Sequence, residues 1–478
     1  MKRIICCLLC LCMLFSIVAC DGGNNNDIPS TSDKENNSVE NPPDEEVPFY
    51  AGYARADITP TQFPIKLQMG TEATKVLNPI YASCVAFYDG ETKALFVSID
   101  TLSVPQAFYE QVVTEIVKNI DVPKSNIFIC ATHNHSAPKL NEEKVIASLV
   151  KWKRIMSEAI GKAAKEAFDD LALTEAYMGT ADTTGLAFVR RYLLADGTYQ
   201  SVNSNNPSTA DEVAHETEAD PEMQIIRFVR EGDKKDIVIA NWQAHAAHAY
   251  GENQRAISGD FVYWMRKGIE EENDVHFAYF QGGAGNINLH SYVNNVTGRY
   301  VKVGKELAKR CNEALGGLEK IKLGKISSAT SDCKVQIFDD GEELSQAALD
   351  ILEGRNKVEL MKKYDITINE AGSIWTRHKF LMDNPSGYVE LPLFAISFGD
   401  VSFVSAPYEM FDTDAMAVKD ASPFKTAFVC AYTNGHYGYI PSDLAYPHGD
   451  YEVYKSYFVE GTGGILSGKM IEMLKSLK

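Results

Sequence analysis

From residue 48 to the end of the chain, short runs of β-branched and aromatic residues alternate with helical patterns. The runs have the length and composition of strands, and we expect strands at residues 82–87, 94–99, 126–131, 223–229, 237–242, 276–281, 394–398 and 427–432. The intervening patterns predict helices near residues 106–118, 142–170, 261–271, 301–314 and 464–477. Because the two kinds of element are intermixed, the sequence predicts one large α/β domain, at 48–478, with mixed β-sheets and flanking helices.

The first 20 residues have the features of a secretory signal peptide. Two basic residues precede the apolar run 4–18, which is short for a membrane-spanning helix. The run leads into Cys20 and resembles a bacterial lipobox, so Cys20 would be the acylated first residue of the mature protein; a plain signal peptide cleaved nearby is the alternative. Residues 21–47 are rich in Asn, Asp, Glu, Ser and Pro, and predict a disordered tether. We therefore expect a lipid-anchored protein of the bacterial cell envelope, at the periplasmic or outer surface.

Charge and cysteine content exclude several classes of protein. The chain has 46 Lys and Arg residues against 65 Asp and Glu residues, a net charge of −19 without a basic cluster, so nucleic acid is not expected as a partner. Outside the first 20 residues the cysteines are widely spaced, odd in number and without a C-x-x-C pair, which argues against a disulfide framework. They are Cys84, Cys130, Cys311, Cys333 and Cys430.

Side chains of the types that bind metals follow four of the apolar runs. They are His133 and His135 after 127–131, His245 and His248 after 237–242, Glu409 after 403–406, and His436 and Tyr439 after 428–432. Ligands of α/β folds bind at the carboxyl ends of strands, and imidazoles with one carboxylate suit zinc. A single H-x-H pattern also serves ordinary packing. The indication of a metal site comes from four such strand ends in a chain with ten histidines.

Nine segments, taken together and in order, resemble the neutral/alkaline ceramidase N-terminal domain family, especially its short bacterial lipoprotein branch. They are GYARADITP (52–60), FVSIDTL (96–102), ATHNHSAP (131–138), FVRRYLLADGT (188–198), NWQAH (241–245), ISGDF (257–261), FQGGAGNIN (280–288), SAPYEMF (405–411) and YGYIPS (437–442). The resemblance implies the fold of that family and a zinc-dependent amide hydrolase, with one zinc ion per chain.

The resemblance also assigns roles to individual residues. It implies that His133, His245, Glu409 and Tyr439 hold the zinc ion. It further implies that His135 handles protons, that Tyr451 polarises the scissile carbonyl, and that Arg190 or Arg191 reaches the polar head of the substrate. For Tyr451 and the two arginines, ordinary surface or ion-pair roles are the alternative.

Two departures from the family pattern bear on the substrate. Asn288 stands where ceramidases carry a serine proposed as a nucleophile, and an amide cannot form an acyl-enzyme. Asn288, or the backbone N–H groups of the glycine-rich segment 282–285, would instead stabilise an oxyanion. The chain stops at Lys478, so we expect no C-terminal β-sandwich of the kind the family carries. Both departures weaken the inference to a sphingolipid.

The expected reaction is attack of a zinc-activated water on an amide or ester carbonyl. Asp100 and Asp260 follow strands, and would either orient histidines or cap the following helices. Three functions stay open: cleavage of a ceramide-type N-acyl bond, a surface metallo-esterase or deacylase acting on a glycan or another non-sphingolipid substrate, and a non-catalytic binding lipoprotein. The partners expected are a lipid or small amide or ester substrate and, through the anchor, a membrane.

Overall fold

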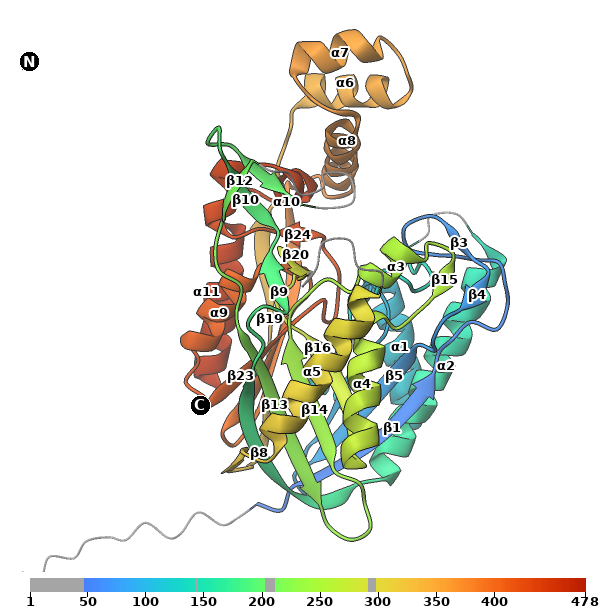
Figure 1. Cartoon of the computed structure of the whole chain (residues 1–478), viewed down its shortest axis with the longest axis vertical. Coiled ribbons are helices and arrows are strands. Elements are labelled where there is room, and N and C mark those ends of the chain that lie inside the picture. The colour runs from blue at the N-terminus through green and yellow to red at the C-terminus, as the bar shows by residue number, and fades with distance from the viewer. Residues whose placement is uncertain (1–46, 142–144, 203–210, 291–297) are drawn as a thin grey trace, which may run out of the picture. The chain divides into compact units, whose positions relative to one another are not determined.

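The computed structural model describes residues 47–141, 145–202, 211–290 and 298–478 (Figure 1). The predicted signal peptide with Cys20, and the predicted tether apart from residue 47, lie outside these residues. Contacts group Glu46–Lys478 into one compact unit. Among the described residues, no helix has the length and apolar character that crossing a membrane requires.

A large mixed sheet organises this unit. Eight of its strands lie in the order β16-β14-β13-β8-β1-β5-β6-β7, and β18 pairs with β8. The β6–β7 and β14–β16 pairs are parallel and the other pairs are antiparallel. The strands are β1 (Tyr50–Asp57), β5 (Tyr81–Tyr88), β6 (Lys93–Ile99), β7 (Ile127–Ala131), β8 (Ala172–Asp182), β13 (Glu222–Arg230), β14 (Ile237–Trp242), β16 (His276–Gln281) and β18 (Glu319–Ile321).

A second, smaller sheet packs face to face on the large one. It contains β19 (Ile326–Gln336), β20 (Tyr388–Phe398), β21 (Val401–Ala406) and β23 (Thr426–Ala431), in that order, with β21 and β23 parallel. Phenylalanine rings fill the space between the sheets: the Phe96 ring of β6 meets the Phe403 ring of β21 edge-on, with the two centroids 4.6 Å apart. Such pairs add to the free energy gained by burying the rings.

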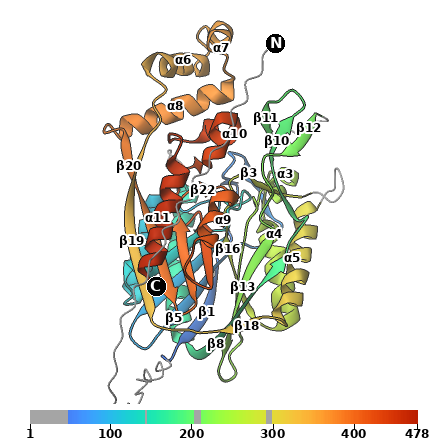
Figure 2. The same ribbon diagram turned by 90° about the vertical axis from the view of Figure 1, so that its left-hand side faces the viewer.

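Helices cover the outer faces of both sheets, which gives four layers (Figures 1 and 2). Along β6, Phe96 faces the second sheet, while Leu95 and Val97 face the helices. Both faces of β6 are therefore buried, which explains its continuous apolar run. The large sheet is covered by α1 (Gln106–Asn119), α2 (Ala147–Asp169), α4 (Asp260–Asn273) and α5 (Arg299–Leu315), and the small sheet by α9 (Asp412–Asp420) and α11 (Thr462–Ser476).

The predicted α/β fold with mixed sheets and flanking helices is confirmed, but the sequence prediction missed several elements. Three helices inserted between β19 and β20 were not predicted: α6 (Glu342–Leu352), α7 (Lys357–Tyr364) and α8 (Ile368–Asp383), which share a small core of their own. The strands β1, β8 and β19 were also missed. The predicted helix 142–170 begins only at Ala147, and residues 142–144 lie outside the described part.

Shorter elements connect the layers. They are β2 (Ile65–Lys66), β3 (Glu72–Ala73), β4 (Lys75–Val76), β9 (Ala187–Val189), β10 (Arg191–Leu194), β11 (Tyr199–Ser201), β12 (Glu212–His215), β15 (Ala256–Ile257), β17 (Ile287–Leu289), β22 (Glu409–Met410), β24 (Tyr439–Ile440), α3 (His248–Glu252), α10 (Tyr451–Lys455) and the 3-10 turns η1 (Lys124–Asn126) and η2 (Asp443–His448).

Replacing Phe96 by alanine should destabilise the protein strongly. The side chain is fully buried between the sheets, and truncating a buried phenylalanine typically costs about 3–5 kcal/mol. Denaturant unfolding of Phe96→Ala measures this loss. Val213→Ala, at a strand position that is 64% exposed, is the control and should change stability by less than about 0.5 kcal/mol. A loss below about 1 kcal/mol for Phe96→Ala would contradict the tight packing of the two sheets.

Candidate metal centre

The carboxyl ends of strands from both sheets meet at one edge of the molecule. His133 follows β7 and His245 follows β14, both in the large sheet, while Glu409 and Tyr439 follow β21 and β23 of the small sheet. Glu409 and Tyr439 lie opposite each other in the parallel β22–β24 pair. Four residues that are far apart in the sequence are thereby brought to one place.

Side chains of two asparagines fasten the loops that carry these residues. Asn434, after β23, accepts a hydrogen bond from the N–H of Ile129 at 2.7 Å and donates one to the carbonyl of Ile127 at 2.9 Å, so it ties the second sheet to β7. Asn134 donates to the carbonyl of Ser258 at 2.7 Å. His133 itself has a φ of 58°, a left-handed conformation that non-glycine residues rarely adopt, and these bonds help to hold it there.

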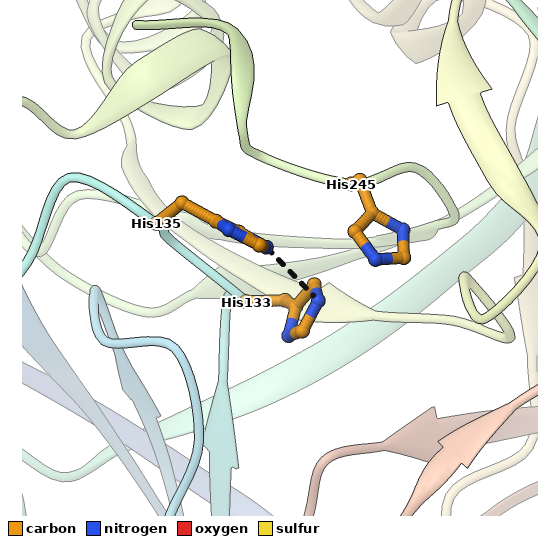
Figure 3. A group of neighbouring side chains, drawn as sticks. All are labelled: His133, His135 and His245. Carbon is orange, nitrogen blue, oxygen red and sulfur yellow. Dashed lines mark hydrogen bonds between the residues drawn. The ribbon is translucent and has the colours of Figure 1, made fainter. Parts of the chain in front are cut away.

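Three imidazoles form the core of the centre: the ligand nitrogens of His133, His135 and His245 lie within 4.8 Å of one another (Figure 3). Nδ1 of His133 is 3.0 Å from the carbonyl oxygen of Leu102, and Nδ1 of His245 is 2.8 Å from that of Ala284. A carbonyl can only accept, so both Nδ1 atoms carry the proton and both Nε2 atoms present a lone pair to the centre. Nε2 of His135 is 3.3 Å from Nε2 of His133.

The Glu409 carboxylate points into this group of lone pairs. Its Oε2 atom is 3.4 Å from Nε2 of His133 and 3.6 Å from Nε2 of His245. Oε2 is buried and has no hydrogen-bond donor among the residues that the structure describes, although a buried carboxylate oxygen without a partner is costly. The Tyr439 hydroxyl lies 3.1 Å from Nε2 of His245. The Glu409 oxygen therefore meets the Nε2 lone pairs of two imidazoles, and among the described residues nothing donates a hydrogen bond to it.

This arrangement fits a metal cation. Ligand atoms about 2.0–2.2 Å from a tetrahedral zinc ion are about 3.3–3.6 Å apart, and the separations among His133, His245, Glu409 and Tyr439 given above are close to this. His135 is near enough to be an alternative member of the set. The ligand atoms, which are imidazole nitrogens with a carboxylate and a phenol oxygen, are also of kinds that bind zinc.

Burial keeps the imidazoles neutral, which is the form that binds metals. Loss of hydration lowers the pKa of His133 and of His245 well below the usual value, and lowers the pKa of His135 to about 4. The Glu409 carboxylate opposes this shift for His133 but does not reverse it. Near neutral pH, protons therefore do not compete with a metal ion for these nitrogens.

The structure separates the two candidate arginines. Arg190 points to the centre, where its Nη2 donates to the Tyr439 hydroxyl at 3.0 Å. Arg191 points away and pairs with Glu216, with Nε 2.7 Å from the carboxylate. Both arginines contact the fully buried Glu452. Burial raises the pKa of Glu452, but the two arginines outweigh this effect and hold it below its usual value. Nothing in the sequence distinguished Glu452 from a surface carboxylate.

Asn288 and Tyr451 lie beside Arg190. Oδ1 of Asn288 faces Nη1 of Arg190 at 3.5 Å, and its Nδ2 donates to the carbonyl of Val202 at 3.3 Å. One of the two amide N–H groups of Asn288 is thus engaged within the protein. The ring of Tyr451 is half-buried and meets the Tyr439 ring edge-on, with the centroids 5.8 Å apart.

The glycine-rich segment 282–285, predicted to offer N–H groups to an anion, packs closely against the protein, and two of its N–H groups are engaged there. The N–H groups of Gly282 and Gly285 donate to the carbonyls of Trp242 and Met410. A Cβ atom at Gly285 would come within 2.7 Å of the carbonyl oxygen of Glu409. Glycine is therefore required here for close approach to the strand that carries Glu409.

Neither aspartate expected near the centre orients a histidine there. Asp100 forms a bidentate ion pair with Arg266, with oxygen–nitrogen distances of 3.0 and 3.1 Å. Asp260 begins α4 and its Oδ2 accepts from the N–H of Ala249, while Gly259 takes the N-cap position. The ring nitrogens of His133 and His245 are oriented by backbone carbonyls instead, and a backbone carbonyl has no signature in a sequence.

The two stacked mixed sheets and the buried imidazole group define the class: an α/β protein with side chains that can hold a metal ion at the strand ends. The sequence matches the family described as neutral/alkaline non-lysosomal ceramidase, N-terminal, over residues 49–362. The chain therefore belongs to this family, and membership supports a hydrolase. Glu409, Tyr439 and Tyr451 lie beyond the matched range. No curated protein matches the chain.

Solved structures extend the likeness in fold to most of the chain. The crystal structure of a neutral ceramidase from Pseudomonas aeruginosa is 18% identical, with a TM-score of 0.69 over 91% of this chain and 75% of that one. A ceramidase structure described as complexed with C2 is 17% identical, with a TM-score of 0.68 over 90% of this chain and 75% of that one. At these identities the comparison establishes the fold.

The lowered pKa values predict how stability depends on pH in the metal-free protein. As the pH falls from about 6.5 towards 4, the unfolded chain binds protons at these imidazoles that the folded chain does not, so the free energy of unfolding falls. His135→Gln removes one such group and should flatten the decline, by at most about 1.4 kcal/mol per pH unit. Denaturant unfolding between pH 8 and 4.5 measures this. Equal declines in wild type and variant would contradict the lowered pKa of His135, and above pH 7 the two curves should run parallel.

Proposed function

We propose that this chain is a zinc-dependent hydrolase that cleaves an amide bond, of the N-acyl kind found in ceramides. The observation that carries the proposal is the buried Oε2 atom of Glu409, which lacks a donor and faces two imidazole nitrogens. Membership of a ceramidase family supports amide hydrolysis as the reaction.

His133, His245, Glu409 and Tyr439 are the proposed zinc ligands. Zinc bound there supplies Lewis acidity, which activates water and polarises a carbonyl. The protein contributes the fixed orientation of both imidazoles through the carbonyls of Leu102 and Ala284. It also excludes bulk water, because His133 and His245 are almost fully buried.

His135 is the proposed proton carrier of the site. It is the most exposed of the three imidazoles, and its Nε2 lies 3.3 Å from Nε2 of His133. Burial lowers its pKa, so the ring is neutral at pH 7, and its unprotonated nitrogen would accept a proton from water and pass it to the leaving amine. Arg190 and Tyr451 both contact Tyr439; Tyr451 would polarise the substrate carbonyl, and Arg190 would reach the polar head of the substrate.

A lipid-like amide is the first candidate substrate. One of the similar structures is described as a ceramidase complexed with C2, which supports a lipid-like amide. Asn288 favours a second candidate, a metallo-esterase or deacylase for another substrate. It lies beside Arg190, and its amide group donates to the carbonyl of Val202. Because asparagine has no hydroxyl group, it cannot act as the nucleophile proposed for the serine at this position in the family.

We also propose that the protein acts from a membrane surface, through a lipid on Cys20. The apolar run 4–18 before this cysteine and the polar segment 21–47 after it support an anchor followed by a tether. The localisation follows from this anchor: the bacterial cell envelope, at the periplasmic or outer surface.

Purified protein beginning at residue 48 should bind one tightly held zinc ion per chain, and Glu409→Ala should lose it. Elemental analysis after dialysis measures the content, and hydrolysis of short N-acyl amides is compared with that of matched esters. Glu270→Ala removes a carboxylate paired with Arg55 on the outer face, and should keep both zinc and activity. Wild-type protein that holds no zinc after addition of the metal would rule out the metallohydrolase and leave the binding protein.

Anchoring is tested by expressing the full-length protein in a bacterial host. The wild-type chain should fractionate with membranes and incorporate labelled fatty acid, whereas Cys20→Ser should lose the label and appear in the soluble fraction. Folding of both is checked by zinc content. Label retained in Cys20→Ser would contradict acylation at this residue.

A further inference from the structure

A fully buried carboxylate joins the two arginines beside the metal centre. Oε1 of Glu452 accepts from Nε of Arg190 at 2.7 Å, and Oε2 accepts from Nη1 of Arg191 at 2.9 Å. Ser201 donates its hydroxyl to the same Oε2 atom. Glu452 has no exposed surface. It therefore fixes one edge of each guanidinium group with charge-assisted hydrogen bonds, which are the strong ones.

The other edge of Arg190 faces the metal centre. Its Nη2 donates to the hydroxyl of Tyr439 at 3.0 Å and to the carbonyl of Gly285 at 2.9 Å. Within the described part of the chain, its Nη1 has one long contact, 3.5 Å to Oδ1 of Asn288. With Nε held by Glu452 and Nη2 held by Tyr439, the guanidinium plane cannot turn, and Nη1 is the donor left for a bound substrate.

Arg191 belongs to the same hydrogen-bond network, but its second carboxylate partner is Glu216. Its guanidinium pairs with Glu216 at 2.7 and 3.1 Å and donates to the carbonyl of Gly449 at 3.1 Å. Glu216 in turn lies 2.6 Å from Nδ1 of His448. These contacts fasten β10 to the residue that follows β12 and to the end of η2. Two buried carboxylates thus bind the same arginine, and only Glu452 also touches Arg190.

We propose that Glu452 is a positioning residue, which holds Arg190 so that its Nη2 supports the Tyr439 hydroxyl and its Nη1 is presented to the substrate. The inference rests on the proposed function, because it assumes that Tyr439 is a metal ligand and that Arg190 meets the substrate. Groups that orient metal ligands typically change metal affinity or activity by 10- to 100-fold when they are removed.

A double-mutant cycle separates positioning from a purely structural role. The four proteins are wild type, Glu452→Gln, Arg190→Ala and the double variant. Three quantities are measured for each: kcat/KM on the best acylated substrate, the Kd for Zn²⁺ by competition with a chelator, and the melting temperature. We expect Glu452→Gln to lower kcat/KM and weaken Zn²⁺ binding by about 10-fold or more in wild type, but by less than about threefold once Arg190 is absent.

Glu216→Gln is the matched control, since it removes the other buried carboxylate of the network without touching Arg190. It should lower the melting temperature about as much as Glu452→Gln does, and leave kcat/KM and the Zn²⁺ Kd within about threefold of wild type. Equal losses of kcat/KM and Zn²⁺ affinity for Glu452→Gln in the two Arg190 backgrounds would overturn the inference. So would equal losses of activity in Glu216→Gln and Glu452→Gln.

Two further outcomes are distinguished by the same experiment. If Glu452→Gln fails to fold, Glu452→Asp replaces it in the cycle, because this change keeps the charge and only withdraws the carboxylate. If wild type binds Zn²⁺ but cleaves no amide or ester, the proposed function fails and the cycle is decided on the Zn²⁺ Kd alone. A wild-type chain that binds no Zn²⁺ would overturn the proposed function and the positioning role together.

Discussion

The contact between the two sheets is the constraint on which the metal centre depends. Phenylalanine rings pack across the interface, with Phe96 of β6 against Phe403 of β21, and this packing sets the place of one sheet over the other. His133 and His245 come from the large sheet, Glu409 and Tyr439 from the small one. Neither sheet can form the centre alone. The side chain of Asn434 adds a further link between the sheets, because it bonds to the β7 backbone at Ile127 and Ile129.

The parts of the fold that the sequence predicts well are those buried on both faces. The strand predicted at 237–242 has the bounds of β14, and that at 276–281 the bounds of β16, because continuous burial demands a continuous apolar run. β19 was missed, since its exposed face carries serine, threonine and lysine and breaks the run. The helices α6–α8 form a separate small core. The local sequence pattern of these helices does not show that they are inserted between two neighbouring strands of the small sheet.

For the site, the sequence indicated the ligand types and the strand ends, but not the groups that orient them. The orienting partners of His133 and His245 are backbone carbonyls, whose position depends on tertiary structure alone. The glycines of 282–285 suggested an anion-binding loop, and the sequence did not indicate that Gly285 also allows close packing against the Glu409 strand. Glu452 could not be recognised either. A glutamate next to a tyrosine in a polar stretch resembles a surface residue until the fold buries it between two arginines.

The buried carboxylates of Glu452 and Glu216 compensate the positive charges of Arg190 and Arg191 beside the metal centre. A metal cation bound by His245 and Tyr439 would stand close to the guanidinium of Arg190, which donates to the same tyrosine at 3.0 Å. In a site shielded from water, two cations at such a separation repel strongly. The Glu452 carboxylate, 2.7 Å from Nε of Arg190, offsets that charge on the far side of the arginine. Since Glu452 itself also faces Arg191, the second carboxylate at Glu216 completes the balance of two positive and two negative groups. The arginine can then act as an oriented donor beside a metal site without adding an uncompensated charge to it.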